Sequence, residues 1–212
     1  MNPIDTVLQQ SFPTVMVPSR EQVESMIRSG ERLLVGSNGV FLEVVRPWIR
    51  VVRRIAMYHA LTAVPYGAVE EVTELRCGPV PPVLITEFHA TARAAFPNEV
   101  GAWIVWNEKS CEFRLIQVHS LSHGPSHLDY ERPQLVEGES LVVDCHSHGQ
   151  WKAYFSSTDN KDDRYDVKFA FVLGNCDRDP SRVLRLCVKG IFEDFSDVPQ
   201  AWAAALAKEV SC

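Results

Sequence analysis

The sequence predicts an α/β (α+β) fold in which a mixed β-sheet is flanked by helices. Most of its apolar runs are short, and Asn38-Gly39 stands between two of them, which is a strong hairpin signal. Two longer segments, at 83–96 and 198–210, carry apolar residues at helical spacing. Strands that alternate with a few helices pack as a sheet covered by those helices.

Length and composition exclude several classes of protein. The chain has 212 residues, of which 46% are hydrophobic and 23% charged, so it can bury a core as one large domain or two small ones. A net charge of −6 argues against nucleic acid or an anionic membrane as the main partner. No apolar run approaches the roughly 18 residues of a membrane span, and the first residues lack the pattern of a signal peptide. The six cysteines have no CxxC spacing, so we expect reduced thiols in a cytoplasmic protein.

Residues 1–78 are predicted to form an N-terminal unit of one helix and several strands. The helix is expected at 17–30, with Ser19 as its N-cap and Gly30 as its end. The Asn38-Gly39 hairpin follows, with further strands at 48–58 and 68–77, and the segment "CGPVPP" closes the unit. The sequence leaves its role open between a partner- or substrate-binding unit and a packing extension.

Residues 79–212 are predicted to form a second unit, which ends in a helix. Its first helix lies at 83–96 and is followed by two strands joined by a polar turn. Residues 121–139 are expected to be a loop. The apolar run at 140–146 is expected to be a central strand, and strands at 166–174 and 182–195 precede the closing helix at 198–210.

The stretch "DCHSHGQWKAYFSSTDNKDD" carries a candidate metal site. His146 and His148 end the apolar strand, and the period of two along a strand points both imidazoles to one side. Asp159 can return to them if the chain turns, for example in a short helix capped by Ser157 or Thr158. Two histidines and an aspartate would leave a fourth position for water, as in catalytic zinc sites. A His-x-His pair alone is a weak signal, because surface loops often carry one.

A wider pattern resembles a known family. The order His146-Ser147-His148, seven residues, Ser156, two residues, Asp159 is similar to the signature of the JAMM (MPN+ or JAB) zinc metalloproteases. The family also has a glutamate on an early strand, and Glu99 in "FPNEVGAWIVW" matches it. The resemblance covers roughly residues 83–195. The wording around the motif resembles one branch of the family, protein A of the PRTRC cassette of bacterial integrative elements.

The resemblance implies a JAB/MPN-type fold and a set of roles. One Zn²⁺ per chain would be held by His146, His148 and Asp159. Glu99 would act as general base and then general acid, and Ser156 would donate a hydrogen bond to the oxyanion. The family cleaves amide bonds after the C-terminal glycines of ubiquitin-like proteins. The implied partners are a ubiquitin-like protein or its conjugates, together with components that resemble ubiquitin-activating and ubiquitin-conjugating enzymes.

Other interpretations remain open at this point. Glu87 and Glu108 are alternatives to Glu99 as the base, and Ser147 is expected to orient its loop rather than react. Trp151 and Tyr154 are expected either to line a substrate groove or to pack in the core or at the rim of the groove. The second histidine group is interpreted mainly as loop residues, one of which could face the cleft: His119, His123 and His127. At the level of function, a non-catalytic scaffold and a zinc amidohydrolase acting on another peptide-like substrate are the alternatives.

Three further acidic residues stand near the candidate ligands in the sequence. Asp144 precedes the histidines and is expected either to support them or to be a charge in a surface turn. Asp162 and Asp163 are expected to lie on a helix face or behind the ligands, rather than to bind the metal.

Overall fold

A computed structural model describes residues 3–59 and 64–208 of the chain. The chain divides into two compact units, Met1–Gly78 and Pro79–Cys212, and each is described by itself. Both units contain a β-sheet and at least one helix, so the predicted α+β class is confirmed. The free thiols among the described residues are Cys77, Cys111, Cys145, Cys176 and Cys187. No helix in the described part of the chain is long and apolar enough to cross a membrane.

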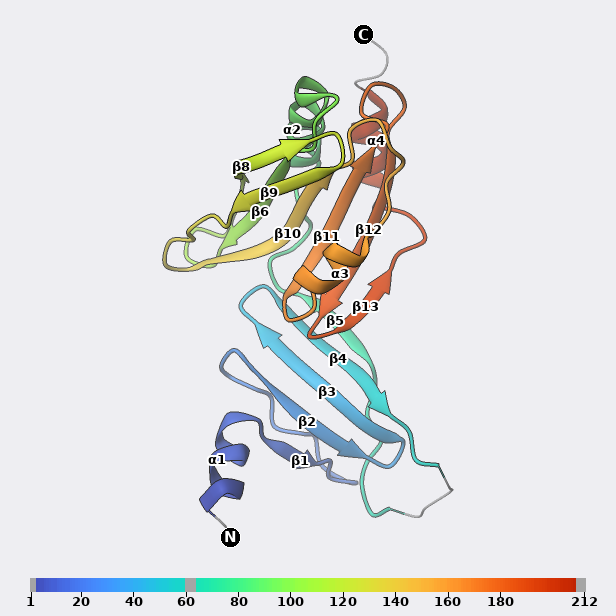
Figure 1. Cartoon of the computed structure of the whole chain (residues 1–212). Helices are drawn as coiled ribbons and strands as arrows, with labels where there is room; N and C mark the ends of the chain where they lie inside the picture. The colour runs from blue at the N-terminus through green and yellow to red at the C-terminus, as the bar shows by residue number, and fades with distance from the viewer. Residues whose placement is uncertain (1–2, 60–63, 209–212) are drawn as a thin grey trace. The chain divides into compact units, whose positions relative to one another are not determined.

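The N-terminal unit is a helix followed by one five-stranded sheet in the order β1-β2-β3-β4-β5 (Figure 1). Its elements are α1 (Pro3–Ser11), β1 (Thr14–Met16), β2 (Gly30–Gly36), β3 (Gly39–Arg46), β4 (Ile49–Ala56) and β5 (Val72–Leu75). The hairpin predicted at Asn38-Gly39 is confirmed: it joins β2 to β3, and Gly36 pairs with Gly39.

The helix predicted at residues 17–30 is wrong. The chain between β1 and β2 is irregular, and Gly30 begins β2 by pairing with Val45 instead of ending a helix. Val17 is buried against Leu34 and Phe41, so this segment covers the sheet with apolar side chains. Burial on a sheet outweighs a weak helical propensity. Among the described residues of this unit the helix is α1, in a segment where the sequence pattern predicts none.

The second unit is built on a six-stranded sheet in the order β13-β12-β11-β10-β6-β7. Its elements are α2 (Pro82–Ala95), β6 (Gly101–Asn107), β7 (Glu112–Gln117), β10 (Glu139–Ser147), α3 (Ser157–Asp162), β11 (Val167–Gly174), β12 (Ser181–Val188), β13 (Ile191–Asp194) and α4 (Gln200–Lys208). Strands β10 and β11 run parallel, and the other neighbouring strands run antiparallel. The sheet is therefore mixed, and β10 lies inside it, as predicted.

Two segments of this unit differ from the sequence prediction. The expected loop at 121–139 contains a hairpin, formed by β8 (His119–Gly124) and β9 (His127–Glu131). The expected single strand at 182–195 is two strands, because the chain turns at Lys189-Gly190, where φ is +50° and +93°. Lys189 gives no turn signal, and a single glycine inside a strand pattern, such as Gly190, indicates a bulge as readily as a turn, so the sequence marks this turn only weakly.

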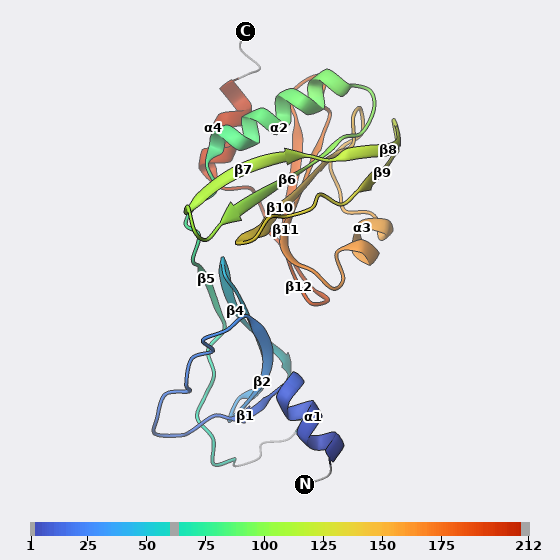
Figure 2. The ribbon, with the colours of Figure 1, turned by 90° about the vertical axis from the view of Figure 1, so that its left-hand side faces the viewer.

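Helices cover the two faces of the six-stranded sheet unequally. Helices α2 and α4 lie on one face, and the short helix α3 lies on the other (Figures 1 and 2). Phe171 of β11 joins the core under the two longer helices, with ring centroids 6.3 Å from Phe88 of α2 and 5.5 Å from Trp202 of α4. Cys145 of β10 pairs with Phe171 and shares its face. The alternating residues Asp144 and His146 therefore point to the face that carries α3.

Candidate metal centre

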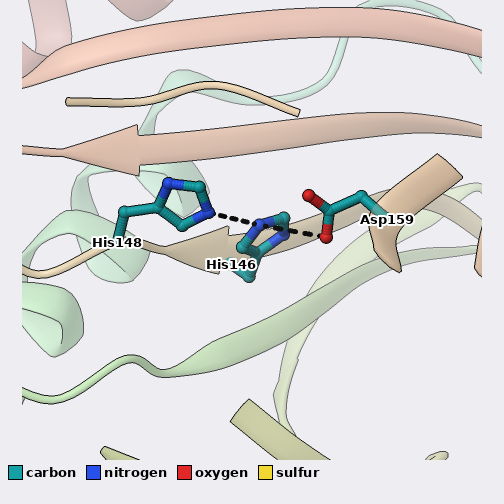
Figure 3. A group of neighbouring side chains, drawn as sticks. All are labelled: His146, His148 and Asp159. Atoms are coloured by element: carbon teal, nitrogen blue, oxygen red, sulfur yellow. Dashed lines mark hydrogen bonds and ion pairs between the residues drawn. The ribbon is translucent and has the colours of Figure 1, made fainter. Parts of the chain in front are cut away.

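Three side chains that could bind a metal ion meet where β10 ends and α3 begins. The ligand atoms of His146, His148 and Asp159 all lie within 4.8 Å of one another. His146 Nε2 lies 3.2 Å from His148 Nε2 and 3.6 Å from Asp159 Oδ1. Figure 3 shows both imidazoles and the carboxylate directed at one another. The three residues named by the sequence motif are thus brought together.

The donor set fits a zinc ion. Ligands of a tetrahedral zinc at its usual Zn–N and Zn–O bond lengths lie about 3.3 Å apart. Two of the three separations, 3.2 and 3.6 Å, are close to this value, and all three are within 4.8 Å. Burial of His148, followed by the neighbouring His146, lowers the pKa of His148. The lowered pKa keeps that imidazole neutral, which is the form that binds a metal.

A capping box orients Asp159. Ser156 is the N-cap of α3: its Oγ accepts a hydrogen bond from the backbone N–H of Asp159, at 3.1 Å. In return, the backbone N–H of Ser156 donates to Asp159 Oδ2, at 2.6 Å, so Oδ1 is the oxygen that faces His146. The cap expected at Ser157 or Thr158 is therefore wrong by one or two residues. The reciprocal Ser-x-x-Asp pattern decides the position, because it satisfies two backbone donors at once.

Glu99 lies on the wall of the same cavity as the three candidate ligands. It stands two residues before β6, and only 8% of its surface is exposed. Burial of the carboxyl group and the nearby charge of Asp159 raise the pKa of Glu99 to about 7. A carboxyl group with such a pKa can both accept and release a proton near neutral pH.

Ser147 and Gly149 hold the segment that carries Glu99. The Ser147 hydroxyl accepts a hydrogen bond from the backbone N–H of Val100, and the Ser147 N–H donates to the Val100 carbonyl, at 3.0 and 2.9 Å. Ser147 therefore orients the loop, as expected. Gly149 has φ +50°, and a Cβ atom there would lie 2.2 Å from the carbonyl oxygen of Pro97. Only glycine allows this close approach of the two segments.

The cavity has a volume of about 460 Å³ and extends beyond the ligand group. Glu87 lies on α2 and Glu108 follows β6, and neither lines this cavity. Of the second histidine group, His127 lines the cavity, whereas His119 and His123 lie on strand β8.

Two aromatic residues follow the histidines. Tyr154 lines the cavity and packs edge-on against His148, with ring centroids 4.5 Å apart, while 55% of its surface remains exposed. Trp151 is exposed to the same extent but does not line this cavity. Tyr154 is therefore the aromatic residue of the two that can contact a molecule at the metal centre.

Comparison with protein families identifies the second unit. Residues 81–187 match the family described as prokaryotic homologs of the JAB domain. The chain belongs to this family. The match includes the strand β10, the helix α3 and Glu99, so every candidate site residue lies inside the JAB domain. Residues 2–76 match a second family, described as a domain of unknown function (DUF2016).

Other comparisons add little to this assignment. A solution structure of protein DSY2949 from Desulfitobacterium hafniense is similar at 16% identity and a TM-score of 0.41. The similarity covers 55% of this chain and 88% of that one. The comparison with curated proteins found no match.

A group of buried charges beside the JAB-domain site was not found from the sequence. Lys168 lies 2.6 Å from Asp144 and 2.8 Å from Asp163, and Asp163 also binds Arg185. Asp144 and Asp163 line the same cavity as the candidate ligands, and their carboxylates bind these two cations. Their cationic partners belong to other strands, so no local spacing could indicate them.

Proposed function

We propose that this chain is a zinc-dependent isopeptidase or peptidase that cleaves amide bonds after the C-terminus of a ubiquitin-like protein. One observation carries the proposal: a His-His-Asp group that can hold a metal shares a cavity with a buried glutamate. Membership of the JAB-domain family supports it. The proposed ion is held by His146, His148 and Asp159, and when bound it supplies an acidified water and a Lewis acid.

Each residue of the site has a distinct task in this proposal. Glu99 takes a proton from the attacking water and delivers it to the nitrogen of the leaving amine, for which its pKa of about 7 is suitable. The oxygen of Ser156 is occupied by the backbone N–H of Asp159, so its hydroxyl hydrogen is available to the oxyanion. Ser147 fixes the position of Glu99 through Val100.

The partners follow from the resemblance to protein A of the PRTRC cassette. We propose that the substrate is a ubiquitin-like protein or its conjugate, handled together with proteins that resemble ubiquitin-activating and ubiquitin-conjugating enzymes. The exposed Tyr154 beside His148 offers an apolar contact for an extended chain terminus entering the cavity.

The test is cleavage of fusions in which ubiquitin-like proteins ending in Gly-Gly precede a reporter. We expect cleavage after the second glycine by the zinc-loaded protein, loss of cleavage with a chelator, and recovery when zinc is restored. Glu99→Gln keeps the size of the side chain and serves as the matched control, with at least a 100-fold lower rate expected. Cleavage that persists with chelator, or in the Glu99→Gln variant, would contradict the mechanism. Zinc binding without cleavage of any fusion would favour the alternative function, a non-catalytic scaffold.

A further inference from the structure

Helix α3 carries the proposed ligand Asp159 but has almost no hydrophobic anchorage. It is only six residues long, Ser157–Asp162, and none of its residues is buried. Helices this short are not stable alone, and most helical stability in proteins comes from packing of an apolar face. The capping box fixes the first turn of α3, but it does not attach the helix to the sheet.

Lys168 makes that attachment. This residue of β11 is 1% exposed, and its Nζ lies 2.8 Å from Asp163 Oδ1 and 2.6 Å from Asp144 Oδ2. Asp163 is the C-cap of α3, and its N–H donates to the carbonyl of Asp159. Asp144 stands two residues before His146 on β10. One ammonium group thus joins β10, which carries His146 and leads directly into His148, to the helix that carries the aspartate.

Arg185 of β12 makes a second attachment, at the other oxygen of the same Asp163 carboxylate. Its guanidinium donates to Asp163 Oδ2 and to Asn160 Oδ1, both at 2.5 Å. The group also lies over the rings of Phe155 and Phe192, at 4.0 and 4.3 Å from their centroids. Phe155 directly precedes the N-cap Ser156. Arg185 therefore binds the last turn and the C-cap of α3 and contacts the residue before its N-cap, which explains how an exposed helix keeps a fixed position.

We propose that Lys168 and Arg185 are positioning residues of the metal centre, which fix Asp159 beside the two histidines by anchoring helix α3 to the sheet. The inference rests on the metal site of the proposed function, but it does not require cleavage of any substrate. The contacts described above join Lys168 to Asp163, and Arg185 to Asp163 and Asn160. Each cation therefore acts on Asp159 through these neighbouring residues of α3. If Lys168 and Arg185 only stabilised the fold, removing either of them would instead destabilise the whole unit equally.

The test measures zinc affinity of the full chain by competition with a chromogenic chelator, without substrate. Lys168→Met removes the ammonium group and keeps an unbranched side chain, and we expect it to weaken zinc binding roughly 10- to 100-fold. Asn160→Ala removes one contact of Arg185 at an exposed position, and we expect a loss of about 3- to 10-fold. The control is Arg114→Met, which breaks the two-bonded pair with Glu139 at the other end of β10 and should leave zinc affinity unchanged.

Amide hydrogen exchange of the metal-free protein separates positioning from stability. In Lys168→Met we expect faster exchange at the amides of Asn160 and Asp163, which are bonded within α3, and little change in β6. Zinc affinity equal to the wild type in folded Lys168→Met, or a uniform rise in exchange across the unit, would overturn the proposal. If Lys168→Met does not fold, Asn160→Ala decides alone, and unchanged affinity there overturns it. Zinc affinity and amide exchange are measured without substrate, so these outcomes test the proposal even if no fusion is cleaved.

Discussion

Glu99 carries a charge that the folded protein disfavours. Its pKa is raised to about 7 by burial and by the charge of Asp159, whereas the ordinary value is 4.5. Between these two pH values the folded state binds more protons at Glu99 than the unfolded state does, so this residue contributes less stability as the pH rises. A catalytic base held in such surroundings is therefore expected to reduce the stability of the metal-free protein.

Glu99→Gln should stabilise the metal-free protein in a pH-dependent manner. Glutamine is neutral at every pH, so it avoids the charge that burial penalises. We expect no difference from the wild type below about pH 3.5, where the carboxyl is protonated in both states, and a gain of about 2–3 kcal/mol in the free energy of unfolding above pH 8. Urea unfolding with chelator present measures this. A difference that is constant over this pH range would show that the charge of Glu99 is not its cause.

Gly149→Ala should destabilise the chain and displace Glu99. The new Cβ would lie 2.2 Å from the Pro97 carbonyl oxygen, at a φ of +50° that alanine disfavours. We expect a loss of about 2–4 kcal/mol from the clash and the backbone strain together. Gly78→Ala is the control, because Gly78 has φ +75° but no neighbour within 4 Å, and about 1 kcal/mol is expected there. Equal losses at the two positions would contradict the close approach as the cause.

The candidate ligands could be predicted from the sequence because their signal is local. His146, His148 and Asp159 lie within fourteen consecutive residues, in a spacing set by one strand end and one capped helix. Lys168 and Arg185 could not be predicted in this way. They belong to neighbouring strands, and their partner Asp163 is reached only once the sheet register is known.

At the scale of single elements, α3 depends on its cap more than on its composition. Ser156→Ala removes the acceptor for the Asp159 N–H, and we expect a loss of about 1 kcal/mol in the free energy of unfolding. Because the same box orients Asp159 Oδ1, zinc affinity should fall as well. Thermal unfolding and chelator competition measure the two effects. Ser156→Thr retains the hydroxyl and should keep both the stability and the zinc affinity near those of the wild type. A threonine variant as unstable and as weak in zinc binding as the alanine variant would argue against the cap.

Hydrophobic periodicity predicts a helix or strand well where the element buries one face in the core, or where the whole strand is buried. Strand β10 and helix α2 were found because their apolar residues enter the core of one sheet. The cap and stop signals at Ser19 and Gly30 predict a helix at 17–30, whereas Val17 and Val23 pack over the sheet from an irregular chain. The hairpin β8–β9 was missed because it consists mostly of exposed polar residues. Both segments are held by tertiary contacts or backbone pairing, so they lack the apolar periodicity that indicates a helix or a strand in the sequence.

At the scale of the whole molecule, the chain consists of two compact units, and all candidate site residues belong to one of them. A ligand that binds only the folded state raises stability by mass action. Zinc at 100 times its Kd should raise the free energy of unfolding of the unit that binds it by about 2.7 kcal/mol. The N-terminal unit has its own sheet and its own buried cluster around Val17, Leu34 and Phe41.

Zinc should therefore protect the two units unequally. We expect slower amide exchange in β10, α3 and the start of β6 when zinc is added, and unchanged exchange in β2, β3 and β4 of the N-terminal unit. Asp159→Asn is the control, because it removes the carboxylate while leaving a side chain of the same shape, and zinc should then give little protection. Exchange followed by mass spectrometry with and without zinc measures the effect. Equal protection of both units would mean that zinc binding is coupled to the sheet of residues 14–75, and that the metal centre does not act within its own unit alone.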